Sequence, residues 1–194
     1  DIVIEGNRIA DIRIAGTPGL PLKPNREPRD ATEELDATGM YVLPGFVDMH
    51  VHGGDSEKAP NLEYAYKLWL AHGVTTVRGV PLASAAVSAS EKDRSARNEI
   101  AAPRIWNYQT LGSGWGRVDT PEKARVWVRW AAQHNIDGIK FFNTGDETPE
   151  IDAAAIDEAK KLGLGTVAHL SQTGVAQLNA VQAGRLGLGT VTHF

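Results

Sequence analysis

The stretch Phe46-Val-Asp-Met-His50-Val-His52 joins an apolar strand pattern to two histidines at its end. Side chains alternate between the two faces of a strand, so His50 and His52 project to the same side. Two imidazoles at the end of an otherwise buried strand make a poor core segment and a good platform for a metal ion. The stretch therefore predicts a strand that ends at a metal site.

Two near-copies further along the chain repeat this arrangement. Lys161-Leu-Gly-Leu-Gly-Thr-Val-Ala-His169 and Arg185-Leu-Gly-Leu-Gly-Thr-Val-Thr-His193 lie 24 residues apart. That spacing suits one strand-plus-helix unit, which would place the two histidines at equivalent strand ends. A further apolar segment, Gly138-Ile-Lys140-Phe-Phe, carries a lysine in the same kind of position.

From Gly45 onward, apolar strand patterns alternate with helical ones. We expect strands at 45–51, 73–79, 103–108, 137–142, 164–169 and 188–193, and helices at about 60–72, 84–99, 120–134, 149–162 and 172–184. Thr120 and Thr148 each precede a proline as helix N-caps, and Gly73, Gly163 and Gly184 are the expected C-caps.

Alternating strands and helices predict an α/β fold with a parallel sheet covered on both faces. Six units of about 25 residues fit a TIM-like (β/α)8 barrel of which six of the eight strands are visible. A doubly wound sheet is the competing architecture, but it needs a glycine-rich phosphate turn after its first strand. Here that strand is followed by His50-Val-His52-Gly-Gly.

Residues 1–44 have a different pattern and predict a small β domain of the sandwich type. Short strands are expected at 1–5, 8–15, 33–36 and 41–43, with a hairpin turn at Gly6-Asn7 and a proline-rich loop over 16–32. Residues 45–194 form the second domain, the partial barrel. Both ends of the chain suggest a piece cut from a longer protein.

Composition excludes several classes of partner. The 194 residues are 42% hydrophobic and 23% charged, and the net charge of −4 is spread without basic clusters. We therefore expect a small-molecule substrate, no nucleic acid and no membrane, and further expect a homo-oligomer. The sequence has no cysteine, which excludes thiolate ligands. It leaves the localisation open between cytoplasmic and exported.

Active sites of β/α barrels lie at the carboxyl ends of the strands. The expected ligands there are His50, His52, Lys140, His169 and His193. A single histidine in such a place is more often a hydrogen-bonded core residue, but four in equivalent positions favour a metal site. His72 and His134 instead fall in last helical turns, where an imidazolium suits the negative helix end.

Lys140 is the most informative of the five. An ammonium group repels a cation, so a lysine among imidazole ligands suggests a neutral or modified amine. Addition of CO2 gives a carbamate, an anion whose two oxygens can bridge two metal ions, and burial favours the reactive neutral amine. The alternative is an ion pair with Asp137 or Asp146.

The chain resembles the amidohydrolase superfamily, in particular its prolidase-like and imidazolonepropionase-like branch. The resemblance lies in residues 37–52, in Gly73-Val-Thr-Thr-Val-Arg78, in Gly138-Ile-Lys140 and in the two Gly-Thr-Val-x-His strands. It implies a distorted β/α barrel with a β-sandwich, and two divalent ions, zinc being the first choice. His50 and His52 would bind the more buried ion, Lys140 would be the carbamylated bridge, and His169 and His193 would bind the second ion.

The resemblance also implies an activity, hydrolysis of amide bonds in dipeptides, N-acyl amino acids or cyclic amides by a metal-activated hydroxide. The family's catalytic base is an aspartate after an eighth strand that this sequence lacks, so residues 1–194 alone are not expected to be a competent hydrolase. Tyr108, Trp115 and Arg117 are candidate substrate-binding residues, with ordinary surface packing as the alternative. The rival hypothesis for the chain is a catalytically incomplete metal-binding remnant or a structural fragment.

Overall fold

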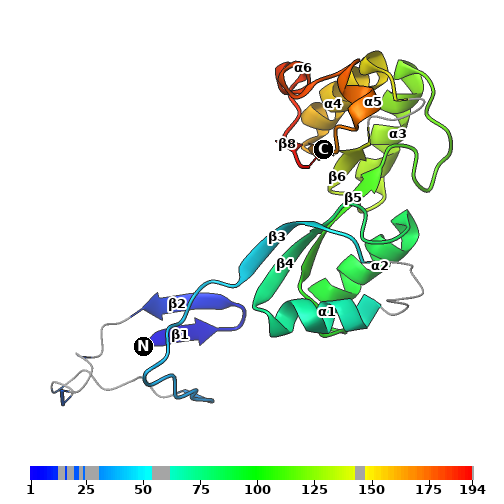
Figure 1. Cartoon of the computed structure of the whole chain (residues 1–194). Coiled ribbons are helices and arrows are strands. Elements are labelled where there is room, and N and C mark those ends of the chain that lie inside the picture. Colours follow the sequence, from blue (N-terminus) through cyan, green and yellow to red (C-terminus); the bar gives the residue numbers. More distant parts are fainter. Residues whose placement is uncertain are drawn as a thin grey trace. The chain divides into compact units, whose positions relative to one another are not determined.

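The computed structural model describes residues 1–12, 16, 20–21, 24, 31–53, 62–142 and 147–193 (Figure 1). Contacts between residues divide the chain into two compact units, Asp1–Leu43 and Pro44–Phe194. The first unit contains a hairpin, and the second contains the sheet and the helices.

The first unit holds one antiparallel hairpin, β1 (Ile2–Glu5) and β2 (Arg8–Ile12), which turns at Gly6-Asn7 as predicted. The strands expected at 33–36 and 41–43 do not form; these residues are turns and irregular chain. Leu35 is 93% exposed and Tyr41 is 95% exposed. A strand needs a partner for its backbone groups, and these segments have none in the described part of the chain. The sandwich-type domain stays a prediction, and residues 13–15 and most of the loop 16–32 lie outside the described residues.

The second unit is built on a parallel sheet of six strands. They are β3 (Phe46–Val51), β4 (Val74–Gly79), β5 (Arg104–Thr110), β6 (Gly138–Phe141), β7 (Gly165–Ala168) and β8 (Thr190–Val191). The order in space is the order in sequence, β3-β4-β5-β6-β7-β8, and every pair of neighbours is parallel. The sheet curls into a half-barrel, which confirms the predicted partial β/α barrel.

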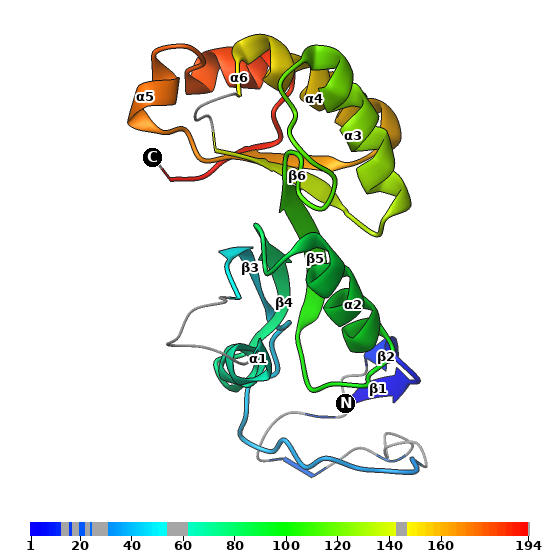
Figure 2. The same cartoon turned by 90° about the vertical axis from the view of Figure 1, so that its right-hand side faces the viewer.

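Helices connect successive strands and cover one face of the curled sheet (Figure 2). They are α1 (Leu62–Ala71), α2 (Ala85–Ala96), α3 (Pro121–Gln133) and α4 (Pro149–Leu162), followed by two short ones. Two hydrophobic clusters hold the layers together. One packs Trp127 of α3 and Ile156 of α4 against Ile139 and Phe141, and the other packs Tyr66 of α1 against the first strands.

The starts of α3 and α4 carry the expected Thr-Pro pair. The hydroxyl of Thr120 accepts a hydrogen bond from the backbone N–H of Lys123 at 3.2 Å, so it caps α3 as predicted. Thr148 occupies the same position before α4, but its hydroxyl makes no cap hydrogen bond. Pro149 at the first helical position favours the start of α4, because its fixed φ suits the helix.

The last helix differs from its prediction. Instead of one helix over 172–184, the chain forms α5 (Gln172–Val175) and α6 (Ala180–Leu186). Asn179 and Gln182 form a reciprocal capping box that starts a new helix. Gly184 lies inside α6, and the left-handed C-cap is Gly187 at φ 99°, which corresponds to Gly163 at φ 71° after α4. The two near-copies of sequence thus repeat a helix C-cap as well as a strand.

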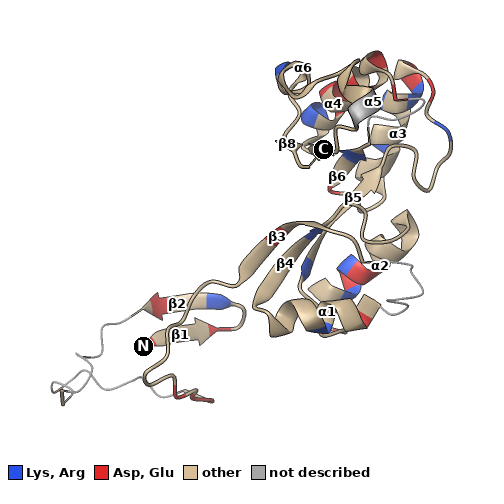
Figure 3. Cartoon of the chain, viewed as in Figure 1, with Lys and Arg blue, Asp and Glu red and all other residues tan. Residues whose placement is uncertain are grey.

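Charges of both signs lie on the helices of the second unit (Figure 3). Arg94 pairs with Glu91 within α2, and Lys161 pairs with Asp157 within α4. Across the described residues, none of the helices combines the length and apolar character needed to cross a membrane.

Candidate metal centre

Four histidines from three strands meet at the carboxyl ends of the half-barrel. The ring centroids of His50 and His52 lie 5.2 Å apart, those of His50 and His193 lie 4.9 Å apart, and those of His169 and His193 lie 4.4 Å apart. β3 and β8 are the two outer strands of the sheet, so it is the curl that brings His193 to His50. The structure therefore brings together the histidines that the sequence placed at equivalent strand ends.

His50 lies at the centre of this group and lacks the partners that a core histidine would have. Both ring nitrogens are buried, and neither makes a hydrogen bond with the described residues. Burial, followed by the charges of Lys140, His52, His193 and Arg78, lowers the pKa of His50 to about 4. The imidazole is therefore neutral at physiological pH, which is the form that binds a metal ion.

His52 is oriented by the backbone. Its Nδ1 lies 3.1 Å from the carbonyl oxygen of Pro81, in the loop after β4. A ring that donates from Nδ1 to a carbonyl keeps the lone pair on Nε2, the arrangement that metal-binding histidines commonly show. His72 and His134 instead contact the carbonyls of Leu68 and Trp130, four residues back, at the ends of their helices.

Lys140 is fully buried on the sheet face opposite to Ile139 and Phe141, which pack against the helices. Its Nζ lies 5.1 Å from the ring centroid of Phe142 and has no hydrogen-bond partner in the described part of the chain. Burial, and then the charge of Arg78, lowers the pKa of the amine to about 8.

The alternative ion pair of Lys140 with Asp137 does not form. Asp137 instead accepts from Lys92 Nζ at 2.7 Å and from the backbone N–H of Asn107 at 2.7 Å. Asp146, the other candidate partner, lies outside the described residues.

Arg78 and Tyr108 line the same face of the sheet, beneath the histidines. The guanidinium of Arg78 is buried and lies over the Tyr108 ring, 5.1 Å from its centroid. The Tyr108 ring in turn crosses Gly138 and Gly165. A Cβ on Gly138 would lie 2.3 Å from Tyr108 Cε1, and one on Gly165 would lie 1.9 Å from the Tyr108 hydroxyl. Only glycine therefore fits beneath this ring.

Among the residues with described positions, no three His, Cys, Asp or Glu side chains are arranged to hold one ion. The rings of His169 and His193 meet edge to face at 89°, and those of His50 and His193 are tilted at 60°.

Known proteins provide an independent comparison. No protein-family model matches the chain. A dihydroorotase of Staphylococcus aureus is 27% identical over 186 residues, which cover 91% of this chain and 42% of that protein. A dihydroorotase of Shouchella clausii is 26% identical over 162 residues, 80% of this chain and 36% of that protein. A solved structure from Bifidobacterium longum, provisionally identified as a prolidase, is 27% identical and superposes with a TM-score of 0.63 over 81% of this chain and 41% of that one.

The chain is related to the amidohydrolase superfamily. The relationship extends over most of the chain at low identity, and it agrees with the half-barrel fold. An adenine deaminase of Methanoculleus marisnigri is 54% identical, but only over 50 residues, 26% of this chain. The chain spans less than half the length of these relatives.

Two of the three candidate substrate-binding residues of this amidohydrolase relative lie in the loop after β5. Trp115 is 40% exposed, and Arg117 lies 3.9 Å from Asp119. Tyr108, by contrast, lies within β5 and has its ring over the glycines. Contact of any of the three with a substrate stays a prediction.

Arg78 is the residue at this centre that the pattern did not single out. Its place in β4, beside the buried Val77, was the available signal, because a charged residue in an apolar strand has to face something polar.

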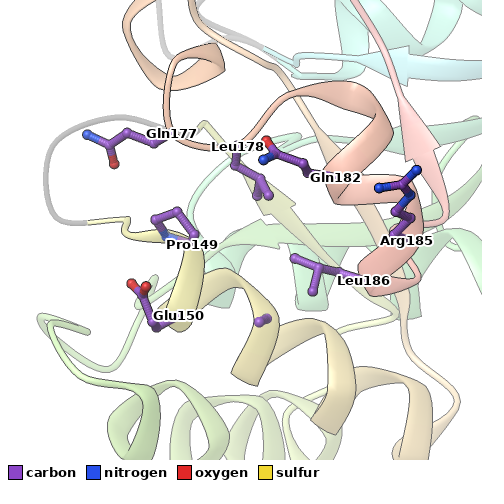
Figure 4. Close-up of a pocket in the computed structure, with 8 residues that line it drawn as sticks. Pro149, Glu150, Gln177, Leu178, Gln182, Arg185 and Leu186 are labelled. Atoms are coloured by element: carbon purple, nitrogen blue, oxygen red, sulfur yellow. The ribbon is translucent and has the colours of Figure 1, made fainter.

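A separate pocket lies between the start of α4 and α6, and none of the five predicted metal ligands lines it (Figure 4). Its lining consists of Pro149, Glu150, Ala153, Gln177, Leu178, Gln182, Arg185 and Leu186.

Proposed function

We propose that the chain forms the metal-binding part of a hydrolase that cleaves carbon–nitrogen bonds in small molecules. The observation that carries the proposal is the grouping of four imidazoles around a buried lysine at the strand ends. The relationship to dihydroorotases, and to a structure provisionally identified as a prolidase, supports the bond class.

The residues present fit two divalent ions, with zinc as the first choice. Among the described residues, the two buried ring nitrogens of His50 and the buried amine of Lys140 have no hydrogen-bond partner. Such groups are costly to bury unless something binds them. His50 with His52, and His169 with His193, would each supply two imidazoles to one ion, and Lys140 would join the two sets. Bound divalent ions would supply an activated water and polarise the scissile carbonyl group.

Lys140 can serve as a bridge only after a covalent change. The lone pair of the neutral amine attacks the carbon of CO2 and forms a new N–C bond. One C=O π bond breaks and its electron pair moves to oxygen, and the nitrogen loses one proton to solvent. The product is an anionic carbamate with two oxygen donors. Burial and the charge of Arg78 both favour the neutral amine that this step requires.

Small amides are the proposed substrates, namely dipeptides, N-acyl amino acids or cyclic amides. Trp115 and Arg117, in the loop after β5, would contact them, the indole through apolar surface and the guanidinium through a carboxylate. Tyr108 would shape the floor of the site, because its ring covers the start of β6 and β7.

The proposal is tested by loading the metal-free protein with zinc and ¹³C-bicarbonate. We expect two zinc ions per chain, a ¹³C carbamate resonance that disappears in Lys140→Arg, and hydrolysis of at least one amide class by the whole protein of which this chain would be the metal-binding part. Lys160, an exposed lysine of α4, provides the matched Lys160→Arg control. Failure to bind zinc at all would refute the proposal.

The alternative is a metal-binding remnant without catalysis. The same experiment separates the two, because a remnant would bind zinc and form the carbamate but would hydrolyse none of the three amide classes. Turnover near 10 s⁻¹, an ordinary enzyme value, would refute the remnant.

A further inference from the structure

Arg78 makes contacts that reach from one edge of the half-barrel to the other. Its Nε donates to the carbonyl oxygen of Met49 in β3 at 2.7 Å, and its Nη1 donates to the hydroxyl of Thr190 in β8 at 3.3 Å. The side chain is 6% exposed, and its guanidinium rests on the Tyr108 ring. One side chain from β4 thus contacts β3, β5 and β8.

The two hydrogen-bond acceptors are close in sequence to two of the predicted metal ligands. Met49 precedes His50, and Thr190 lies three residues before His193. β3 and β8 are the first and last strands in the sheet order and share no backbone ladder. Yet the rings of His50 and His193 lie 4.9 Å apart. Strand pairing connects the two edges only through the four strands between them, so a direct contact across the curl would fix their separation more closely.

The guanidinium group of Arg78 is suited to hold β3 and β8 at a fixed separation. A guanidinium is planar and presents its N–H donors in a fixed geometry, so two bonds made at once fix the distance between their acceptors. A lysine in its place would keep the charge but would offer a single flexible nitrogen. The aromatic face of Tyr108 limits the remaining freedom of the guanidinium plane.

We propose that Arg78 is a positioning residue that ties β3 to β8 and thereby sets the spacing of His50 and His193 for metal binding. The second half of this statement rests on the proposed function, whereas the tie itself does not. The third guanidinium nitrogen of Arg78, Nη2, is buried without a partner among the described residues.

The experiment compares Arg78→Lys with Thr190→Val. The first keeps the charge and loses the guanidinium group, and the second is nearly isosteric and removes only the hydroxyl acceptor. Arg129→Lys is the matched control, because Arg129 donates through Nε to Glu158 on the outer helices. If Arg78→Lys does not fold, Thr190→Val still tests the proposal.

Two measurements are made on each variant. Hydrogen exchange of the metal-free protein reports the tie, and we expect faster exchange at the β3 and β8 amides in both variants and not in the control. Zinc affinity, from competition with a chromophoric chelator, should fall about 10-fold, as is usual when a residue that orients a metal ligand is lost. The double variant should bind zinc no more weakly than Arg78→Lys alone, because both changes break one link.

Hydrogen exchange and zinc affinity together distinguish failure of the β3–β8 tie, of the positioning role and of the proposed function. Unchanged exchange in both variants overturns the tie, whether or not the protein binds zinc. Faster exchange with unchanged zinc affinity, or additive losses in the double variant, overturns the positioning role. A wild-type protein that binds no zinc refutes the proposed function and with it the positioning role, while the exchange data still decide the tie.

Discussion

Buried polar groups differ between the two faces of the curled sheet, the face covered by the helices and the opposite, concave face that carries Lys140. On the helix side, Gln109 donates to the carbonyl of Ala83 at 3.1 Å and to Asn107 Oδ1 at 2.8 Å, and it accepts from the hydroxyl of Ser113 at 2.9 Å. On the concave side, His50, Lys140 and Arg78 all have buried nitrogens without partners in the described residues.

Hydrogen-bonded and unpaired buried groups have different effects on the folded protein. A buried polar group that is fully hydrogen-bonded specifies the fold, and a buried group left unpaired destabilises it. Across the described chain, five residues have buried side-chain atoms without partners, and three of them belong to the concave face. The other two are Tyr66 and Asp152. Concentration of these unpaired groups on one face supports the proposal that this face binds a ligand.

The largest expected effect is on zinc affinity and follows from substitution of Lys140 on the concave face. Lys140→Ala should reduce zinc affinity by more than the ~100-fold that loss of an orienting residue can cause, and should abolish activity. A short carboxylic acid added to the solution should partly restore both, because it can take the place of the carbamate. Zinc titration with and without the acid measures this, and Lys160→Ala is the control. Full zinc binding by Lys140→Ala would remove this residue from the metal site.

Substitution of Gln109 on the face covered by the helices should instead affect stability and leave zinc binding unchanged. Gln109→Leu leaves Asn107 and Ser113 without their partner and should reduce the free energy of unfolding by about 2–4 kcal/mol. Zinc affinity of the folded variant should stay within about twofold of wild type. Denaturant unfolding and zinc competition measure the two quantities. A large loss of zinc affinity at full stability would show that the two faces are not independent.

Asp152 tests whether an unpaired buried group outside the concave face is merely destabilising. Burial, and then the charge of Glu147, raises the pKa of the Asp152 carboxyl to about 7 in the folded protein. A raised carboxyl pKa means that stability from this group is present below about pH 4 and is lost as pH rises to about 7. Asp152→Asn should therefore be more stable than wild type at pH 8 by about 1–2 kcal/mol, less than the ~4 kcal/mol of the full shift because the amide is buried too.

Thermal or denaturant unfolding between pH 4 and pH 8 measures this difference, which should vanish near pH 4. A pH-independent difference would mean that the carboxyl titrates normally. Glu150→Gln provides a control, since Glu150 lies two residues before Asp152 on the same helix. The pKa of Glu150 is lowered, first by a hydrogen bond with its own backbone and then by one with Thr148.

The smallest effect is expected at a histidine outside the centre. His134→Gln removes the contact of Nδ1 with the Trp130 carbonyl and the stacking of the ring on Trp130 at 4.1 Å. We expect a loss of about 0.5–1 kcal/mol in the free energy of unfolding and no change in zinc stoichiometry. His169→Gln, its counterpart on the concave side, should lose zinc. Equal zinc content in both variants would contradict the division of histidines into two kinds.

Strand positions and the histidine group could be predicted because they depend on local pattern. Apolar runs bounded by glycine mark buried strands, and the parallel sheet then places their carboxyl ends together. These local patterns place His50, His52, His169 and His193 near one another, although which atoms bind a metal stays a prediction.

Features that depend on distant partners could not be predicted. Residues 33–36 and 41–43 look like strands, but a strand forms only where another strand accepts its backbone groups. The break between α5 and α6 is different, because its signal is local: Asn179 and Gln182 form the capping box that starts a new helix. The repeat itself contained the correct C-cap, because Gly187, and not Gly184, corresponds to Gly163.

The stacking of Tyr108 over Gly138 and Gly165 has a consequence for how this protein can vary. A side chain at either glycine would occupy the volume of the ring, so neither position can change while the tyrosine stays. Homologous chains should therefore show correlated substitution, in which a smaller residue replaces the tyrosine wherever either glycine has been replaced. Such covariation would be visible in an alignment without any measurement on the protein, and a selection for suppressors of Gly138→Ala should recover changes at residue 108 first.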